Sequence, residues 1–458
     1  MVDLSQHLTS RRILHIAVPV VLANISIPLL GLVDTSVIGQ MGLATPIGAV
    51  GIGAIILTAL YWIFGFLRMG TTGFAAQAIG AGDKDESAAI LIRALAIAVI
   101  GGLSIVILQL PLFALGFWLS PASDEVENLA RSYMTIRVWS APFLISTFAI
   151  TGWLVAAERT RDILVIQLAM NGTNIGFDLL FVPVLGWGIQ GVASATVIAE
   201  ISGCGLGLWY CRAVFFTASW SNRARLLDPV KIKRFAVVNV DILIRSLLLQ
   251  SIFMSFLFFG ATYGDTRLAA NHILLQFLSV TAYAMDGFAF AAETLVGQAL
   301  GARCRATFRR AALMVSFWCF GTGVVLALMF ALFGGALIDA ITTAPDVRIA
   351  ARDYLVYTTL TPLISVAPFM LDGIFIGATR TRDMRNMMVI STTIYFTFVL
   401  MLMPITANHG LWIALLISFA ARGATLAWKY PALERSILKP VVTFETPTGK
   451  PPGRVQGS

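Results

Sequence analysis

Long apolar stretches alternate with short polar connections along most of the chain. A helix that crosses the hydrocarbon core of a bilayer needs about 20 predominantly apolar residues, and these stretches reach that length. The pattern predicts twelve membrane-spanning helices, at about residues 14–38, 46–72, 88–116, 132–157, 163–184, 189–213, 236–262, 268–297, 310–339, 352–378, 385–406 and 410–431. The fold class expected is therefore an all-α polytopic membrane protein.

The charges in the connections favour one orientation. Basic residues precede the first span and fill the connections after spans four, six, eight and ten: Arg11, Arg12, Arg159, Arg161, Arg223, Arg225, Lys231, Lys233, Arg234, Arg303, Arg305, Arg309, Arg310, Arg380, Arg382 and Arg385. The alternate connections are poor in Lys and Arg, and residues 117–131 are mainly acidic. Because basic loops stay in the cytoplasm, both termini are expected on the cytoplasmic side. The protein itself is expected in the cell (inner) membrane.

Two pairs of segments repeat with a common offset. Residues 73–83 resemble residues 292–303, and residues 152–162 resemble residues 373–383. Gln77 aligns with Gln298 and Thr160 with Thr381, and the difference in sequence number is the same for both pairs. The repeat predicts two six-helix lobes of the same orientation, related by an axis along the membrane normal, with a substrate cavity between them. The lobes are expected at residues 1–213 and 236–435, with a basic cytoplasmic loop at 214–235 and a disordered tail at 436–458.

Asp34 lies inside the first span, where a carboxylate costs several kcal/mol and is a functional candidate by default. At about 1.5 Å per residue it falls in the outer half of the membrane. Asn174 and Asp178, at i and i+4 on span five, and Thr196 on span six reach a similar depth. This oxygen-rich set could bind Na⁺ or share a proton between two carboxylates. The alternative is that each acid makes a helix-to-helix hydrogen bond.

Pro28 and Gly31 precede Asp34 in the first span. Proline removes a backbone hydrogen bond and crowds the preceding turn, so these residues are a candidate hinge, the alternative being a static kink.

Other polar residues occur within the spans. Asp241 and Arg245, at i and i+4 on span seven, are expected to form a structural ion pair. Asp286, Glu293 and Asp372 either line a vestibule that faces the cytoplasm or pair with arginines of the loops. Further candidate polar positions are Thr151 and Glu200. The four cysteines form no metal-ligand spacing, and basic loops account for the net charge of +8, so no nucleic-acid partner is expected.

Several segments together resemble the multidrug and toxic compound extrusion (MATE) family, in its DinF-like branch. They include "PLLGLVDTSVIGQMG", "GFAAQAIGAGD", "NGTNIGFDLLFVPVLGWGIQGVASATVIAE" and "LDGIFIGATRTRDMRN". The resemblance implies a non-enzymatic antiporter that exports organic cations or amphipathic drugs or metabolites in exchange for H⁺ or Na⁺, without another cofactor. It also implies a coupling-ion site at Asp34, Asn174, Asp178 and Thr196, as depth and helix face suggest. We expect a monomer in the bilayer, coupled to H⁺.

Two alternative functions would need other residues. A lipid-linked oligosaccharide flippase of the same superfamily would favour a strongly cationic cavity for pyrophosphate, whereas the N-lobe carries acids. A membrane-embedded enzyme such as a prenyltransferase would need clustered acids that hold Mg²⁺ and diphosphate, and no such cluster is present in the sequence.

Overall fold

The structure, a computed structural model, describes residues 8–39, 44–119, 123–216 and 223–437. Side chains are described in these ranges apart from residues 27–39, 44, 47, 119 and 223. No strand occurs in the described ranges. The α-helices are α1 (Ser10–Gly39), α2 (Ala44–Trp62), α3 (Phe66–Gly80), α4 (Lys84–Ile107), α5 (Gln109–Leu119), α6 (Asp124–Arg137), α7 (Ala141–Ala156), α8 (Thr160–Leu179), α9 (Gly188–Tyr210), α10 (Arg212–Phe215), α11 (Arg223–Leu226), α12 (Pro229–Ala261), α13 (Asp265–Gly301), α14 (Arg305–Ile341), α15 (Pro345–Gly377), α16 (Thr381–Thr406) and α17 (Asn408–Ser436).

The helices confirm the predicted class of polytopic membrane protein. Within the described residues, eleven helical segments are long and apolar enough to cross a membrane, and α1 takes the place of the first predicted span. Short 3-10 turns at Ile63–Gly65 and Val138–Ser140 join α2 to α3 and α6 to α7, so each pair forms one continuous span. The third predicted span is divided into α4 and the short apolar helix α5.

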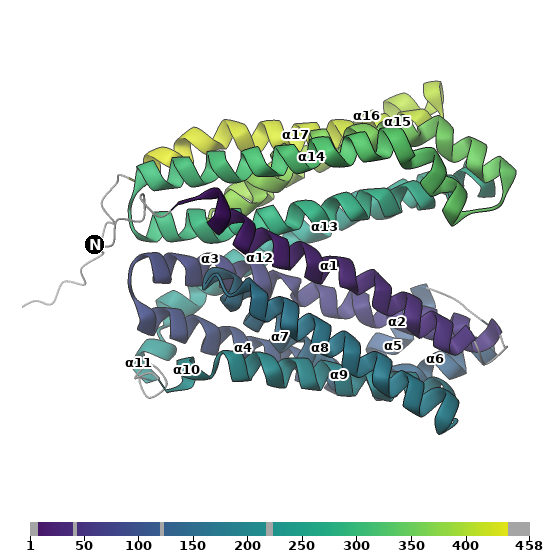
Figure 1. Ribbon diagram of the computed structural model, residues 1–458, viewed down its shortest axis with the longest axis horizontal. Coiled ribbons are helices and arrows are strands. Elements are labelled where there is room, and N and C mark those ends of the chain that lie inside the picture. The colour runs from purple at the N-terminus through teal and green to yellow at the C-terminus, as the bar shows by residue number, and fades with distance from the viewer. Residues whose placement is uncertain (1–7, 40–43, 120–122, 217–222, 438–458) are drawn as a thin grey trace, which may run out of the picture.

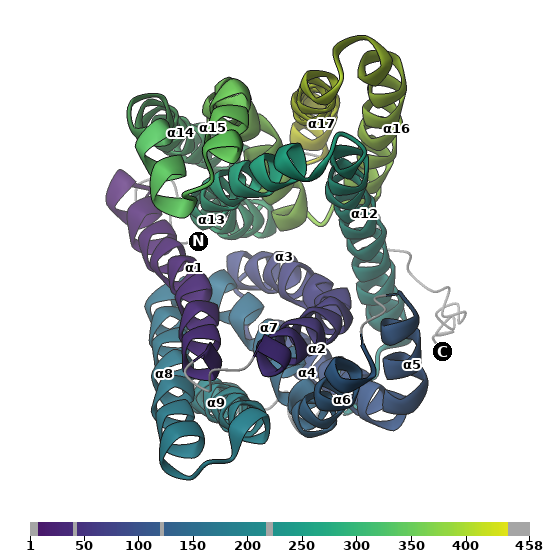
Figure 2. The same cartoon turned by 90° about the vertical axis from the view of Figure 1, so that its right-hand side faces the viewer.

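Two bundles lie side by side (Figures 1 and 2). Helices α2–α9 form the N-lobe and helices α12–α17 the C-lobe, and each bundle has its own buried apolar clusters. Helix α1 belongs to both. Its first turns bury Ile13 and Ala17 in the C-lobe core with Phe288, whereas Val20 is buried with Leu91 in the N-lobe. Helix α1 therefore crosses from one lobe to the other.

The internal repeat is visible in the backbone. Gly82, Glu158, Arg303 and Thr379 have positive φ angles of 77°, 58°, 55° and 52°. Each follows the end of a helix by two residues, and the amides of this and the next residue bond back to the last turn, which makes a Schellman cap. Positions 82 and 303 are equivalent in the repeat, as are positions 158 and 379. The same helix termination is thus used at equivalent places in both lobes.

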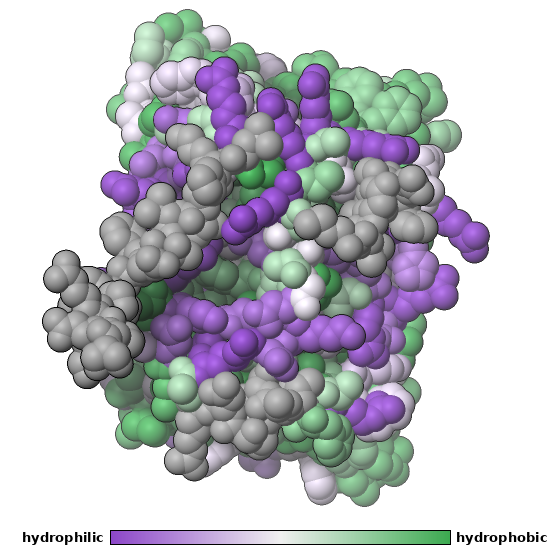
Figure 3. Space-filling model, turned by 90° about the vertical axis from the view of Figure 1, so that its left-hand side faces the viewer, coloured by the Kyte–Doolittle hydropathy of each residue, from purple (hydrophilic) through white to green (hydrophobic). Residues whose placement is uncertain are grey.

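These four caps lie at one end of the molecule, which we call the basic end. Its loops, the short helix α11 and the start of α12 carry basic residues, among them Arg159, Arg225, Lys231, Arg303 and Arg380. Figure 3 looks onto this end and shows hydrophilic residues gathered across its middle. The basic connections predicted from the sequence therefore come together on one face.

Candidate functional site

Three of the four residues predicted to couple a cation are buried in the N-lobe, on two neighbouring helices. Asn174 and Asp178 are fully buried on α8, and Thr196 of α9 is 6% exposed. The Asn174 amide donates to the Thr196 hydroxyl at 3.2 Å, and that hydroxyl donates to the carbonyl oxygen of Val192 at 3.0 Å. The predicted i, i+4 face of α8 therefore meets α9 in a buried polar cluster.

Helix α1 runs along α8 in a fixed register. The Thr160 hydroxyl donates to the carbonyl oxygen of His15 at 3.0 Å, and the Asn171 amide donates to that of Ser26 at 3.1 Å. The separation in sequence is the same for both pairs, so the two helices run in the same direction. The backbone of α1 stays helical through Pro28, Gly31 and Asp34. The side chains of these three residues lie outside the described part of the structure, so the hinge and Asp34 contacts stay predictions.

A second polar site lies between the lobes. The central cavity has a volume of about 270 Å³ and is lined mainly by α12, α13, α15 and α17, with α2 and α3 covering one side. Six ionisable residues line it: Arg68, Arg245, Asp286, Glu293, Asp372 and Arg422. Three acids thus face three arginines in an otherwise largely apolar and aromatic wall. Leucines and phenylalanines such as Leu249, Phe253, Phe369 and Phe419 supply much of that wall.

The ion pairs of this cavity correct one prediction. The expected pair between Asp241 and Arg245 is wrong, since Asp241 binds Arg385 of α16 at 2.5 Å while Arg245 binds Asp372 of α15. Asp372 also accepts from Arg422 of α17. Neighbouring helices offer closer partners than the next turn of α12 does, which the i, i+4 spacing alone does not reveal.

The arginine partners of the other acids also lie within spans and not in loops. Glu293 binds Arg68 across the lobe boundary at 3.0 and 3.3 Å, and the Arg68 guanidinium stacks 3.9 Å from the centre of the Phe290 ring. In the N-lobe, Glu200 binds Arg137 at 2.6 Å. Thr151 is half-buried on α7. Arg68 and Arg137 lie inside apolar spans, which is a signal that the sequence shows, but local spacing indicates no partner for either.

A seal joins the lobes at the basic end. The Gln77 amide donates to the carbonyl oxygen of Gly377 at 2.8 Å, and the Gln298 amide donates to that of Ala156 at 3.1 Å. Positions 77 and 298 are equivalent in the internal repeat, and so are positions 156 and 377. The two contacts are therefore the same contact made twice, once from each lobe, about a pseudo-two-fold axis.

Close backbone approach completes the seal. A Cβ atom added to Gly80 would overlap the backbone of Gln298, and one added to Gly301 would overlap the backbone of Gln77. Glycine is needed at both positions because helices α3 and α13 touch there without side chains between them. The Arg68–Glu293 pair also joins the two lobes, in the wall of the central cavity. The lobes are thus closed against each other at the basic end.

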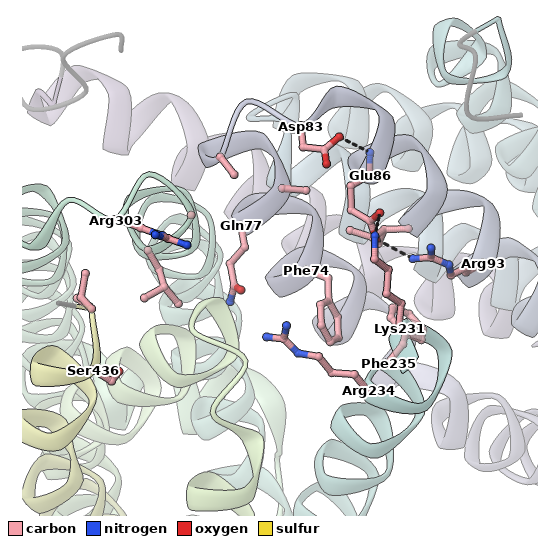
Figure 4. Close-up of a pocket in the computed structure, with 16 residues that line it drawn as sticks. Phe74, Gln77, Asp83, Glu86, Arg93, Lys231, Arg234, Phe235, Arg303 and Ser436 are labelled. Carbon is pink, nitrogen blue, oxygen red and sulfur yellow. Dashed lines mark hydrogen bonds and ion pairs between the residues drawn. The ribbon is translucent and has the colours of Figure 1, made fainter. Parts of the chain in front are cut away.

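A polar cavity of about 440 Å³ opens beside the seal (Figure 4). Gln77 lies in its wall between the lobes, and Arg234 points toward it. Glu86 accepts from Arg93 at 2.9 Å and from Lys231 at 2.6 Å, which ties α4 to the start of α12. The rim of the seal is therefore a network of charges that links the inter-lobe segment to the N-lobe.

Two lobes of membrane-spanning helices, sealed at one end around a central cavity, are the architecture of a membrane transporter with parallel repeats. The MatE family model matches residues 19–180 and 242–401, one match in each lobe. The chain belongs to this family of multidrug and toxic compound extrusion transporters. The two matches end at equivalent positions of the internal repeat.

One relative agrees with this assignment, and two solved structures share the fold. The DNA damage-inducible protein F of Escherichia coli is 36% identical over 420 residues, which cover 90% of each chain. A solved structure of the MATE transporter VcmN of Vibrio cholerae superposes with a TM-score of 0.84 at 19% identity, covering 93% of this chain and 97% of that one. A MOP superfamily transporter of Pyrococcus furiosus, described as having a binding pocket of reverse polarity, gives a TM-score of 0.80 at 18% identity, covering 94% and 97%.

Proposed function

We propose that the protein exports cationic amphipathic compounds across the inner membrane by alternating access, in exchange for H⁺ bound in the N-lobe. The buried cluster of Asn174, Asp178 and Thr196 is the observation that carries this proposal. The register of α1 on α8 supports it. The His15–Thr160 and Ser26–Asn171 bonds share an offset of 145 residues, which pairs position 34 with position 179, next to Asp178. We therefore propose that the carboxylates of Asp34 and Asp178 lie at one depth.

Two close carboxylates in a medium of low dielectric constant do not both stay ionised cheaply, so such a pair takes up a proton readily. The same carboxylate, amide and hydroxyl oxygens also suit Na⁺ as hard ligands, so the donor set fits either ion. We favour H⁺ because a carboxylate pair needs no further ligand to hold a proton.

The seal supports a state that is open away from the basic end. By the positive-inside rule the basic end faces the cytoplasm, so the cavity would exchange with the outside in this state. Binding a proton on the Asp34–Asp178 pair would remove negative charge, let α1 bend at Pro28 and Gly31, and release the compound outward. The proton would leave to the cytoplasm after the lobes reverse. Coupling requires that the two states bind proton and compound with different affinities.

A flippase for lipid-linked oligosaccharides is the competing proposal. Such a protein needs a surplus of cations in its cavity to hold pyrophosphate. The described lining of the central cavity carries as many acids as arginines, which favours export of smaller amphipathic compounds.

The test is dye transport in proteoliposomes under a proton gradient without Na⁺. Asp34→Asn and Asp178→Asn keep side-chain size and remove the titrating group, so each should abolish proton-driven transport while insertion stays normal. Asp241→Asn is the matched control, because Asp241 is also a buried intramembrane acid but lies outside the cluster. Near-normal transport by Asp34→Asn would reject the coupling role. A requirement for Na⁺ in the unmodified protein would reassign the same residues as Na⁺ ligands.

A further inference from the structure

Two buried arginines of the central cavity converge on one carboxylate. Arg245 is 6% exposed and Arg422 4% exposed, and both donate to the same oxygen, Oδ2, of Asp372. One negative carboxylate therefore faces two positive guanidinium groups. The Arg68–Glu293 pair balances itself, so this corner of the cavity has a local surplus of positive charge.

Several polar atoms of residues that line this cavity have no hydrogen-bond partner within the described structure. They are Nε of Arg245, Nε of Arg422, Oδ1 of Asp372 and Oγ of Ser365, all buried. Leaving a buried donor or acceptor unsatisfied costs about 1–3 kcal/mol, so native proteins rarely gather such atoms. Four of them around one cavity indicate a place built to receive a polar group.

Asp286 carries the compensating negative charge. It lines the same cavity from α13, is half-buried, and makes no hydrogen bond or ion pair among the residues that the structure describes. Aromatic side chains such as Phe253, Phe290 and Phe419 lie in the wall with it. The cavity thus offers an acid without a direct partner, an arginine pair with unused donors, and apolar surface.

We propose that the central cavity binds zwitterionic amphiphiles, with the anionic group on Arg245 and Arg422, the cationic group toward Asp286 and the apolar body against the aromatic wall. This inference rests on the proposed export function and narrows its substrates to cations that also carry an anion. A ligand with one positive charge alone would meet three guanidinium groups and gain from only one acid without a partner. A ligand with both charges matches a lining whose charges sum to zero.

The experiment compares two dyes that differ in one group. N-unsubstituted rhodamine has a cationic ring system and a free carboxylate, and its methyl ester is a plain cation of the same shape. Fluorescence anisotropy measures the binding of each dye to the purified full chain in phosphatidylcholine nanodiscs, with empty nanodiscs as the blank. We expect the free acid to bind about tenfold more tightly than the ester, the size of one charge-assisted hydrogen bond.

Two variants should shift this preference in opposite directions. Arg422→Gln removes one donor and should reduce the tenfold preference to near unity. Asp372→Asn removes the internal carboxylate that competes for the arginines, so it should tighten binding of the free acid several-fold and weaken binding of the ester. Arg137→Gln is the matched control, because Arg137 is an ion-paired, partly buried arginine of the other lobe, and it should leave the ratio unchanged.

Equal binding of acid and ester by the unmodified protein would overturn the inference, as would an unchanged ratio in folded Arg422→Gln. If Arg422→Gln does not elute as a folded protein, the test rests on Asp372→Asn. Weaker binding of the free acid by Asp372→Asn than by the unmodified protein would then overturn the inference. Failure of the export function is seen separately, as absence of gradient-driven transport of either dye by the unmodified protein in proteoliposomes. Tighter binding of the free acid without such transport would support the proposed binding site and reject the proposed export function.

Discussion

Replacing Gly80 by alanine should open the seal at the basic end. A Cβ built on Gly80 lies closer than 3.0 Å to the carbonyl oxygen, carbonyl carbon and Cα of Gln298. A backbone carbonyl has no rotamer by which to move aside, so the lobes must separate. Overpacking of this kind costs about 1–3 kcal/mol, which lowers the ratio of sealed to unsealed molecules by about 5- to 150-fold.

The assay is a distance between spin labels at Lys84 and Arg382, which are exposed residues on opposite lobes near the seal. Double electron–electron resonance should show one distance in the unmodified protein and a second, longer distance in Gly80→Ala. Gly301→Ala should give the same shift, because its Cβ would overlap the backbone of Gln77 in the equivalent contact. In the double variant, the distance between the labels should increase by less than the sum of the increases in the two single variants, because one separation of the lobes relieves both overlaps.

The control is Gly205→Ala on α9, where a Cβ would meet no atom within 4 Å. It reports the gain in helix propensity from alanine alone, about 1 kcal/mol, which does not depend on the state of the lobes. An unchanged distance distribution in folded Gly80→Ala and Gly301→Ala would refute the view that close helix contact holds the seal.

Two further predictions concern orientation and pH. Cysteine placed at Glu125 should react with an impermeant reagent added outside cells and cysteine at Leu227 should not; the opposite result would reverse the assigned orientation. Partial burial alone would raise the pKa of Asp83, but hydrogen bonds from the Glu86 amide at 2.9 Å and from Arg225 at 3.0 Å lower it below its usual value. The contribution of this tether to stability is therefore fully present at neutral pH and is lost as the pH falls through the lowered pKa of Asp83. Hydrogen exchange of residues 224–230, corrected for its intrinsic pH dependence, should show this loss in the unmodified protein and not in Asp83→Asn.

Some contacts of the candidate site could be predicted from sequence because helix geometry sets the face and the depth of each residue. Asn174 and Asp178 share a face at i and i+4, and counting residues from the membrane boundary placed Thr196 at their depth. The structure brings Asn174 and Thr196 together as that count suggests. The depth of a residue in the membrane follows from the rise per residue along its own helix, so it can be predicted without knowledge of the tertiary fold.

Other contacts could not be predicted by the same kind of argument. The i, i+4 spacing assigns Arg245 to Asp241, whereas its partner Asp372 is 127 residues distant and Asp241 binds Arg385, 144 residues distant. The partners of a charge inside a bundle depend on which helices pack together and how they are rotated. Gln77 and Gln298 were matched by the repeat, but their reciprocal bonds across the lobes appeared only in three dimensions.

The sequence by itself determined the membrane class, the spans and the two-fold repeat, because the hydrocarbon core demands long apolar helices and a duplicated pattern leaves a constant offset. The tertiary structure decided which buried charges pair, that α1 divides its packing between the lobes, and that the lobes are sealed at the basic end. A transporter of alternating access adopts more than one arrangement of the same helices with one sequence. The arrangement present is fixed by contacts between distant segments, whose energies no local pattern records.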